Sequence, residues 1–193
     1  MRIVFNIVLL LIAAGLAWAL YSSISEPIAF NNVRTLRENA VSAKLEKIRD
    51  AQEIYRDVTG NYAPRFDTLI QVLRNGKVRN IVVNGDPDDP NFTGTITYDT
   101  TYTPAIEEVN RLKLNLDSLN YVPYGKGATF EIAADTITYQ STPGVPVVEV
   151  GVVRNKFMEG YGARFARYDP RYDPNSVIKF GDLQKPNLSG NWE

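Results

Sequence analysis

Residues 3–58 decide the fold of this chain, and they read IVFNIVLLLIAAGLAWALYSSISEPIAFNNVRTLRENAVSAKLEKIRDAQEIYRDV. In residues 3–20, Asn6 is the only strongly polar side chain. A hydrocarbon layer about 30 Å thick is crossed by about 20 apolar residues in a helix. The run is therefore long enough to span a membrane, and the predicted span is marked by Ile3, Leu10, Leu16 and Leu20.

Two interpretations of this run are open. A retained anchor is favoured, because the run exceeds the roughly 7–15 apolar residues at the core of a signal peptide. A cleaved signal peptide is the alternative, because residues 17–19 (AWA) form a small-x-small cleavage pattern. In both cases the folded part lies outside the cytoplasm. We expect a single-pass membrane protein with its N-terminus in the cytoplasm and its domain on the opposite side of the membrane.

A charged, helix-periodic segment follows the run. Pro27 predicts a bend at residues 26–27, because proline kinks or breaks a helix. Beyond it, apolar residues recur at steps of three and four, which defines one helical face: Val41, Leu45, Ile48, Ala51, Tyr55 and Val58. Gly60 predicts the end of this helix. The chain is thus divided into a transmembrane helix (1–25), an amphipathic stalk helix (26–60) and an extracytoplasmic domain (61–193).

The apolar face either packs on the following domain or also serves a partner helix, and the predicted partner-binding site is its N-terminal part, made of Val41, Leu45 and Ile48. If the domain begins after Gly60, these residues lie about 18–28 Å up the helix at 1.5 Å per residue. We therefore expect Val41 and Leu45 to be covered less well within the chain than the C-terminal end of the face. A partner helix would then shield them.

Three short segments that follow the apolar run carry a resemblance to a known family. They are residues 51–55 (AQEIY), 60–62 (GNY) and 66–70 (FDTLI). With the apolar helix and the proline at its exit, they resemble the N-terminal half of type IV pilins and type II secretion pseudopilins. The resemblance implies a long helix, a turn, a short helix and membership of an envelope assembly. It also implies a bacterial inner membrane, with the N-terminus in the cytoplasm and the domain in the periplasm. It does not extend to a basic leader ending in Gly before Phe, or to a Glu near the fifth position of the apolar helix.

A second resemblance covers the whole chain, through residues 118–124 (SLNYVPY), 178–183 (IKFGDL) and 190–193 (GNWE). These segments are similar to an uncharacterised single-pass envelope family of Bacteroidota, which implies no known activity.

The outer domain is predicted to be α+β with a mostly antiparallel sheet. Short helices are expected at residues 67–73 and after Pro104, where apolar residues recur at helical spacing. A hairpin is expected around Asp135. Strands are predicted at residues 80–83, 95–100, 119–124, 129–133, 136–139, 145–153 and 177–180.

The composition excludes several kinds of chemistry. The chain has no Cys and no His, which excludes thiol nucleophiles, imidazole bases and the usual zinc sites. Its net charge of −1 and the lack of a basic stripe argue against a nucleic-acid surface. We therefore expect no enzyme and no cofactor.

Two clusters remain as candidate binding sites. Asp86, Asp88 and Asp89 supply oxygen ligands of the type that calcium prefers, although a solvated acidic turn explains them as well. A tandem repeat of Arg-Tyr-Asp-Pro is either a pair of surface turns or a partner-binding loop, with contacts from Arg167, Tyr168, Arg171 and Tyr172.

Two functions are compatible with this sequence. The first is a membrane-anchored structural or accessory subunit of an envelope or secretion assembly, whose partners are the lipid bilayer, other envelope proteins and further copies of itself. The second is a periplasmic binding module that recognises an envelope polymer or a partner protein through its tyrosine-rich loops.

Overall fold

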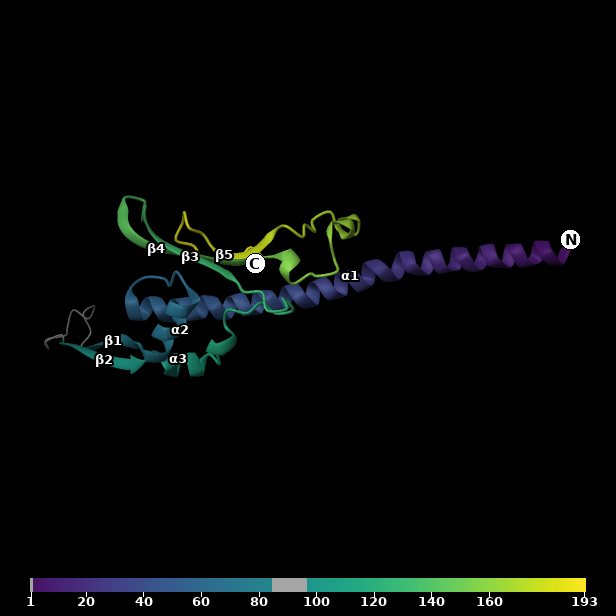
Figure 1. The fold of residues 1–193 in the computed structure, drawn as a ribbon. Helices are drawn as coiled ribbons and strands as arrows, with labels where there is room; N and C mark the ends of the chain where they lie inside the picture. The colour runs from purple at the N-terminus through teal and green to yellow at the C-terminus, as the bar shows by residue number, and fades with distance from the viewer. Residues whose placement is uncertain (1, 85–96) are drawn as a thin grey trace, which may run out of the picture.

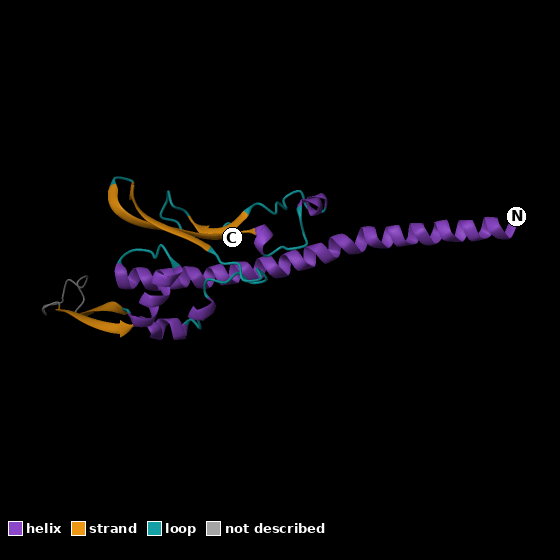
Figure 2. Ribbon diagram, in the orientation of Figure 1, coloured by secondary structure: helices purple, strands orange, loops and turns teal. Residues whose placement is uncertain are grey.

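The computed structural model describes residues 2–84 and 97–193. Its dominant element is α1 (Arg2–Thr59), one helix of 58 residues (Figures 1 and 2). At 1.5 Å per residue this helix is about 87 Å long. Pro27 lies inside it, so the bend predicted at residues 26–27 is not a break, and the predicted span and stalk are one helix. A proline removes one backbone donor and disturbs one turn, which a helix packed on its C-terminal side tolerates.

Two local sets of hydrogen bonds fix the C-terminal end of α1. Gly60 has a φ of 82°, and its N–H donates to the carbonyl oxygen of Arg56 at 2.7 Å, as expected for a helix end. The fully buried amide of Gln52 clamps the following turn. It donates to the carbonyl oxygen of Ala63 at 3.1 Å and accepts the N–H of Ala63 at 2.9 Å. Both hydrogen-bonding groups of the buried amide are thereby satisfied.

One layer packs on the lower side of α1 in Figure 1. It consists of α2 (Phe66–Asn75), β1 (Lys77–Asn84), β2 (Thr97–Pro104) and α3 (Ala105–Arg111). The short helices predicted here are confirmed, and each contributes buried side chains, among them Leu69, Leu73 and Val109. The two predicted strands are longer than expected and form an antiparallel ribbon in which Ile81 lies opposite Thr100.

A three-stranded antiparallel sheet covers the other side of α1 (Figure 1). Its order is β3 (Glu131–Tyr139), β4 (Thr142–Val153) and β5 (Val177–Gly181). Gln140 and Ser141 connect β3 to β4, and their φ values of 46° and 68° are those of a two-residue type I′ hairpin turn. The predicted α+β class with antiparallel strands is confirmed, but the strands form two separate sheets.

Two strand predictions are wrong. The hairpin expected around Asp135 is absent, because this residue lies in the middle of β3, opposite Val147. Its carboxylate is exposed there and needs no turn to stay in water. The strand predicted at residues 119–124 is a series of turns after the short 3-10 helix η1 (Leu116–Ser118). The left-handed φ of Tyr124, 60°, ends any extended run in that segment.

The prediction that Val41 and Leu45 are poorly covered is also wrong. Both are fully buried, as is Ile48, whereas Tyr55 is 8% exposed. The reason is that segments after Gly60 fold back along the helix to the level of this stripe. Arg37 donates to the carbonyl oxygen of Phe157 at 2.9 Å, Lys44 donates to the hydroxyl of Ser118 at 3.4 Å, and β5 also contacts α1. The stripe is part of the chain's own core and is not open to a partner helix in this structure.

Candidate functional site

The N-terminal half of α1 is exposed throughout residues 2–21 and only partly covered by the rest of the chain in residues 22–29. No residue between positions 2 and 29 is buried, and Leu10, Leu16 and Trp18 are each about two-thirds exposed or more. An 18-residue window of this helix has a mean hydropathy of 2.6. By length and composition, α1 is thus the one helix in the described residues that is able to cross a membrane. Its bare half projects far beyond the folded layers (Figure 2).

Phe30 marks the point at which α1 enters the domain. It is the first fully buried residue of the helix, and four aromatic rings from a distant segment surround it. The ring of Phe165 stacks on it at 5.1 Å between centroids, and that of Tyr172 meets it edge-on at 4.9 Å. Tyr161 and Tyr168 complete the cluster. We call this segment, residues 161–172, the collar.

The collar reaches past Phe30 toward the bare half of the helix. The hydroxyl of Tyr168 donates to the carboxylate of Glu26 at 2.6 Å, and the guanidinium of Arg167 lies 3.0 Å from the same oxygen. The hydrogen bond from Tyr168, followed by the positive charge of Arg167, lowers the pKa of Glu26. The same bond raises the pKa of Tyr168. These residues line a shallow hollow with Ser22 and Ser23, so the collar contacts α1 just beyond the apolar run of residues 3–20.

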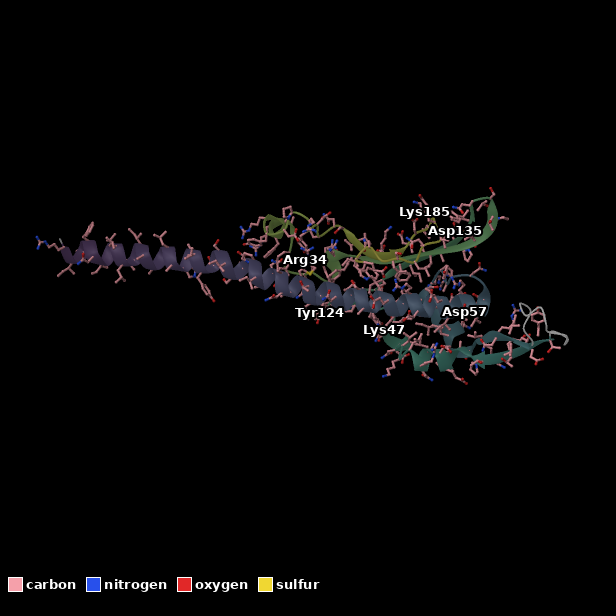
Figure 3. All side chains as sticks on the ribbon, turned by 180° about the vertical axis from the view of Figure 1, so that it is seen from behind. Arg34, Lys47, Asp57, Tyr124, Asp135 and Lys185 are labelled. Carbon is pink, nitrogen blue, oxygen red and sulfur yellow. The ribbon has the colours of Figure 1, made fainter. Side chains whose placement is uncertain are left out.

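Ion pairs tie the next turns of α1 to the collar and the sheet. Arg34 pairs with Asp169 and, at 3.2 Å, with Glu38, which also accepts from Arg154 at 2.8 Å. The backbone N–H of Arg171 and then the Arg34 guanidinium lower the pKa of Asp169. All four paired side chains are at least three-quarters covered. Figure 3 shows Arg34 where the bare helix meets the domain.

The residues of the predicted partner-binding loop differ in their burial and in their contacts. Tyr172 is 2% exposed, and its hydroxyl donates to the carbonyl oxygen of Tyr161 at 2.5 Å, so it is a core residue rather than a partner contact. Tyr168 is committed to Glu26. The side chain of Arg167 is 58% exposed although its guanidinium pairs with Glu26, and that of Arg171 is 94% exposed.

A second exposed surface lies on the β1–β2 ribbon, at the end of the domain away from the bare helix (Figure 1). The register places Arg79, Ile81 and Tyr102 on one face, and this face also carries Tyr98. Ile81 is 50% exposed, Tyr98 66% and Tyr102 63%. In the described residues this is a two-stranded sheet, so each strand keeps an outer edge without a neighbouring strand. Exposed edges and apolar patches are typical of protein-binding surfaces.

The remaining predicted sites are acidic. Asp86, Asp88 and Asp89 lie outside the described residues. Elsewhere, a hollow of about 430 Å³ between α1, α3 and the ribbon is lined by acidic side chains, among them Asp50 and Glu53. Within residues 2–84 and 97–193, no group of three acidic side chains is close enough to hold a metal ion. The lining also includes Arg111, so this hollow carries side chains of both charges.

No family model, curated protein or solved structure matches this chain. Sequence reasoning found the apolar run and the aromatic segment after Gly160, but it missed Phe30 and its contacts with the collar. The one available signal was an aromatic residue three positions after the proline.

Proposed function

We propose that this chain is a non-enzymatic, membrane-anchored structural subunit of an envelope assembly, with a pseudopilin-like layout. The observation that supports it is the division of α1 into a bare apolar half and a half enclosed between two layers. An apolar surface on all sides of a helix is stable in lipid and costly in water. The order of a long helix, a glycine turn, a short helix and an antiparallel sheet agrees with what the resemblance implies.

The surface that contacts other envelope proteins is, in this proposal, the β1–β2 ribbon. The apolar stripe first considered for this role is core, whereas Tyr98 and Tyr102 are exposed at the end of the domain away from the membrane. Because the Tyr161 and Tyr172 rings pack internally, the alternative of a glycan-binding aromatic loop has less support.

Membrane fractionation tests the anchor. The full chain, expressed in a Gram-negative host, is expected to stay in the membrane pellet after washing at alkaline pH, with an intact mass that includes residues 1–19. A double variant, Leu10→Arg with Leu16→Arg, is expected to leave the membrane, because each arginine near the centre of a span costs about 2.5–3.5 kcal/mol. Leu36→Arg is the matched control, since Leu36 is 59% exposed on the same helix but outside the span. Extraction of the unchanged chain, or cleavage after Ala19, would overturn the anchor.

Site-specific photo-crosslinking in native membranes tests the assembly. A benzophenone side chain in place of Tyr98 is expected to yield covalent adducts with other envelope proteins or with a second copy. The same probe at Tyr121, which is 49% exposed on another part of the domain, serves as the control. Adducts at neither site, or equal yields at both, would count against the ribbon as the contact surface.

A further inference from the structure

We propose that the collar is a lipid-binding surface: its exposed arginines bind the phosphates of anionic phospholipids in the leaflet next to the domain. The residues concerned are Arg164, Arg167 and Arg171. This inference rests on the proposed membrane anchor and adds a second, lipid-specific contact to it.

The first argument is that the collar contacts α1 close to the end of the apolar run. That run ends at Leu20, and the hollow shared with the collar begins at Ser22, within the last turn of the predicted transmembrane helix (1–25). Glu26, which pairs with Arg167, lies about 9 Å beyond Leu20 at 1.5 Å per residue. The headgroup layer on each side of the hydrocarbon is about 5–8 Å thick. Tyr21 and Ile24 are 71% and 57% exposed, which favours immersion of the helix beyond Leu20. The collar therefore lies against or within the headgroups.

The second argument is the arrangement of the arginines. Arg164 and Arg167 lie in the 3-10 helix η3 (Ala163–Arg167) and are exposed. Their guanidinium groups lie over the rings of Phe165 and Tyr168, at 4.7 and 4.5 Å from the ring centroids. Stacking on a fixed ring limits the freedom of each guanidinium, and its fork of donors matches the geometry of a phosphate.

The third argument is the balance of charge around the collar. Three carboxylates lie near the arginines, and each has a contact of its own. Glu26 accepts from Tyr168 and Arg167, and Asp169 pairs with Arg34. Asp173 accepts the backbone N–H of Asn175 at 2.8 Å. Arg171 is 4.0 Å from Asp169, at the limit of an ion pair. Arg34, Arg164, Arg167 and Arg171 together outnumber these three carboxylates by one positive charge, and the tyrosines of the collar suit the membrane interface.

A depth measurement on the full chain tests this surface. The chain has no Cys, so a single introduced Cys carries a fluorophore without background labelling. The probe sites are Ala163→Cys in the collar, Leu10→Cys in the span and Lys185→Cys at the far end of the sheet, where Figure 3 shows Lys185. The quencher is a spin label on the lipid headgroup. The vesicles contain phosphatidylethanolamine with about 30% phosphatidylglycerol, or phosphatidylcholine alone.

The expected result is quenching at position 163 in the anionic vesicles and none at position 185. Quenching at 163 should fall several-fold in phosphatidylcholine vesicles, and also in the double variant Arg164→Gln with Arg171→Gln. The contribution of an arginine near an anionic surface corresponds to roughly a fivefold change in binding. Neither arginine pairs with α1 in this structure, so the melting temperature of this variant should not change. Arg65→Gln, an exposed arginine remote from the collar, is the matched control.

The possible results distinguish a failure of the collar proposal from a failure of the proposed membrane anchor. A water-exposed probe at 163, together with a membrane-buried probe at 10, would overturn the collar proposal and leave the anchor standing. Equal quenching at 163 in both kinds of vesicle would overturn the recognition of anionic phosphate. A water-exposed probe at position 10 would overturn the anchor itself.

Discussion

The two halves of α1 belong to one helix, but the rest of the chain covers only one of them. Residues 2–29 include no buried side chain, although they are the most apolar part of the protein. The C-terminal half is rich in charge, yet Phe30, Val41, Leu45, Ile48 and Ala51 are fully buried. The share of apolar residues in a half of α1 therefore does not determine whether the domain packs against that half.

The difference lies in how the apolar side chains are distributed around the helix. In the C-terminal half they form one face, which a sheet and a helical layer are able to cover while the charges stay in water. In the N-terminal half they surround the helix, and two protein layers would still leave flanks exposed. The C-terminal half therefore requires protein against its apolar face, whereas the N-terminal half requires an apolar medium on all sides.

The largest expected effect comes from introducing a charge at a buried position in the C-terminal half of α1. The same charge at an exposed position of that half is the control. Leu45→Glu should reduce the free energy of unfolding by at least about 4 kcal/mol, because a buried carboxylate without a partner is costly and the apolar contacts are lost. Leu36→Glu should change it by no more than about 0.5 kcal/mol, since Leu36 is 59% exposed. Denaturant titration of the full chain in detergent measures both values. Similar losses for the two variants would contradict the assignment of the stripe to the core.

A smaller effect is expected at the boundary between the halves. Phe30→Ala should destabilise the collar by about 3 kcal/mol, because the ring fills the space between Phe165 and Tyr172. Amide hydrogen exchange should rise across residues 161–172 before it rises in α2. Ile28→Ala, two residues earlier and 56% exposed, is the matched control and should leave exchange unchanged. If both variants behave alike, the domain does not begin at Phe30.

Local sequence patterns predicted the helices and strands better than they predicted which segments of the chain pack against one another. Periodicity found α1, its buried face and its end at Gly60, since these depend on residues a few positions apart. The collar was not predictable in this way, because Phe30 meets residues more than 130 positions later in the chain. The coverage of Val41 was misjudged for a related reason, since periodicity identifies an apolar face but not the later segments that fold back over it.

Lowering the pH should produce the smallest of the expected effects. It should weaken the collar and leave the α1 residues before Ser22 unchanged. The pKa values of Glu26 and Asp169 are lowered in the folded chain, so the unfolded chain binds more protons as the pH falls. The stabilisation from these carboxylates is complete above their unfolded pKa values of about 4, and it is lost as the pH falls through the lower, folded values. Because the chain has no His, stability should be nearly flat between about pH 5 and 7.

Hydrogen exchange at pH 3 and pH 6, corrected for the intrinsic rate, measures this loss in the collar. Protection of residues 161–172 should fall at pH 3, and only modestly, because partly exposed ion pairs contribute little and are screened by salt. Glu26→Gln should remove part of the difference by weakening the collar already at pH 6. The amides of α1 before Ser22 make no contact with these carboxylates and should respond to the lipid rather than to acid. A collar whose protection is the same at both pH values would show that its aromatic packing alone holds it to the helix.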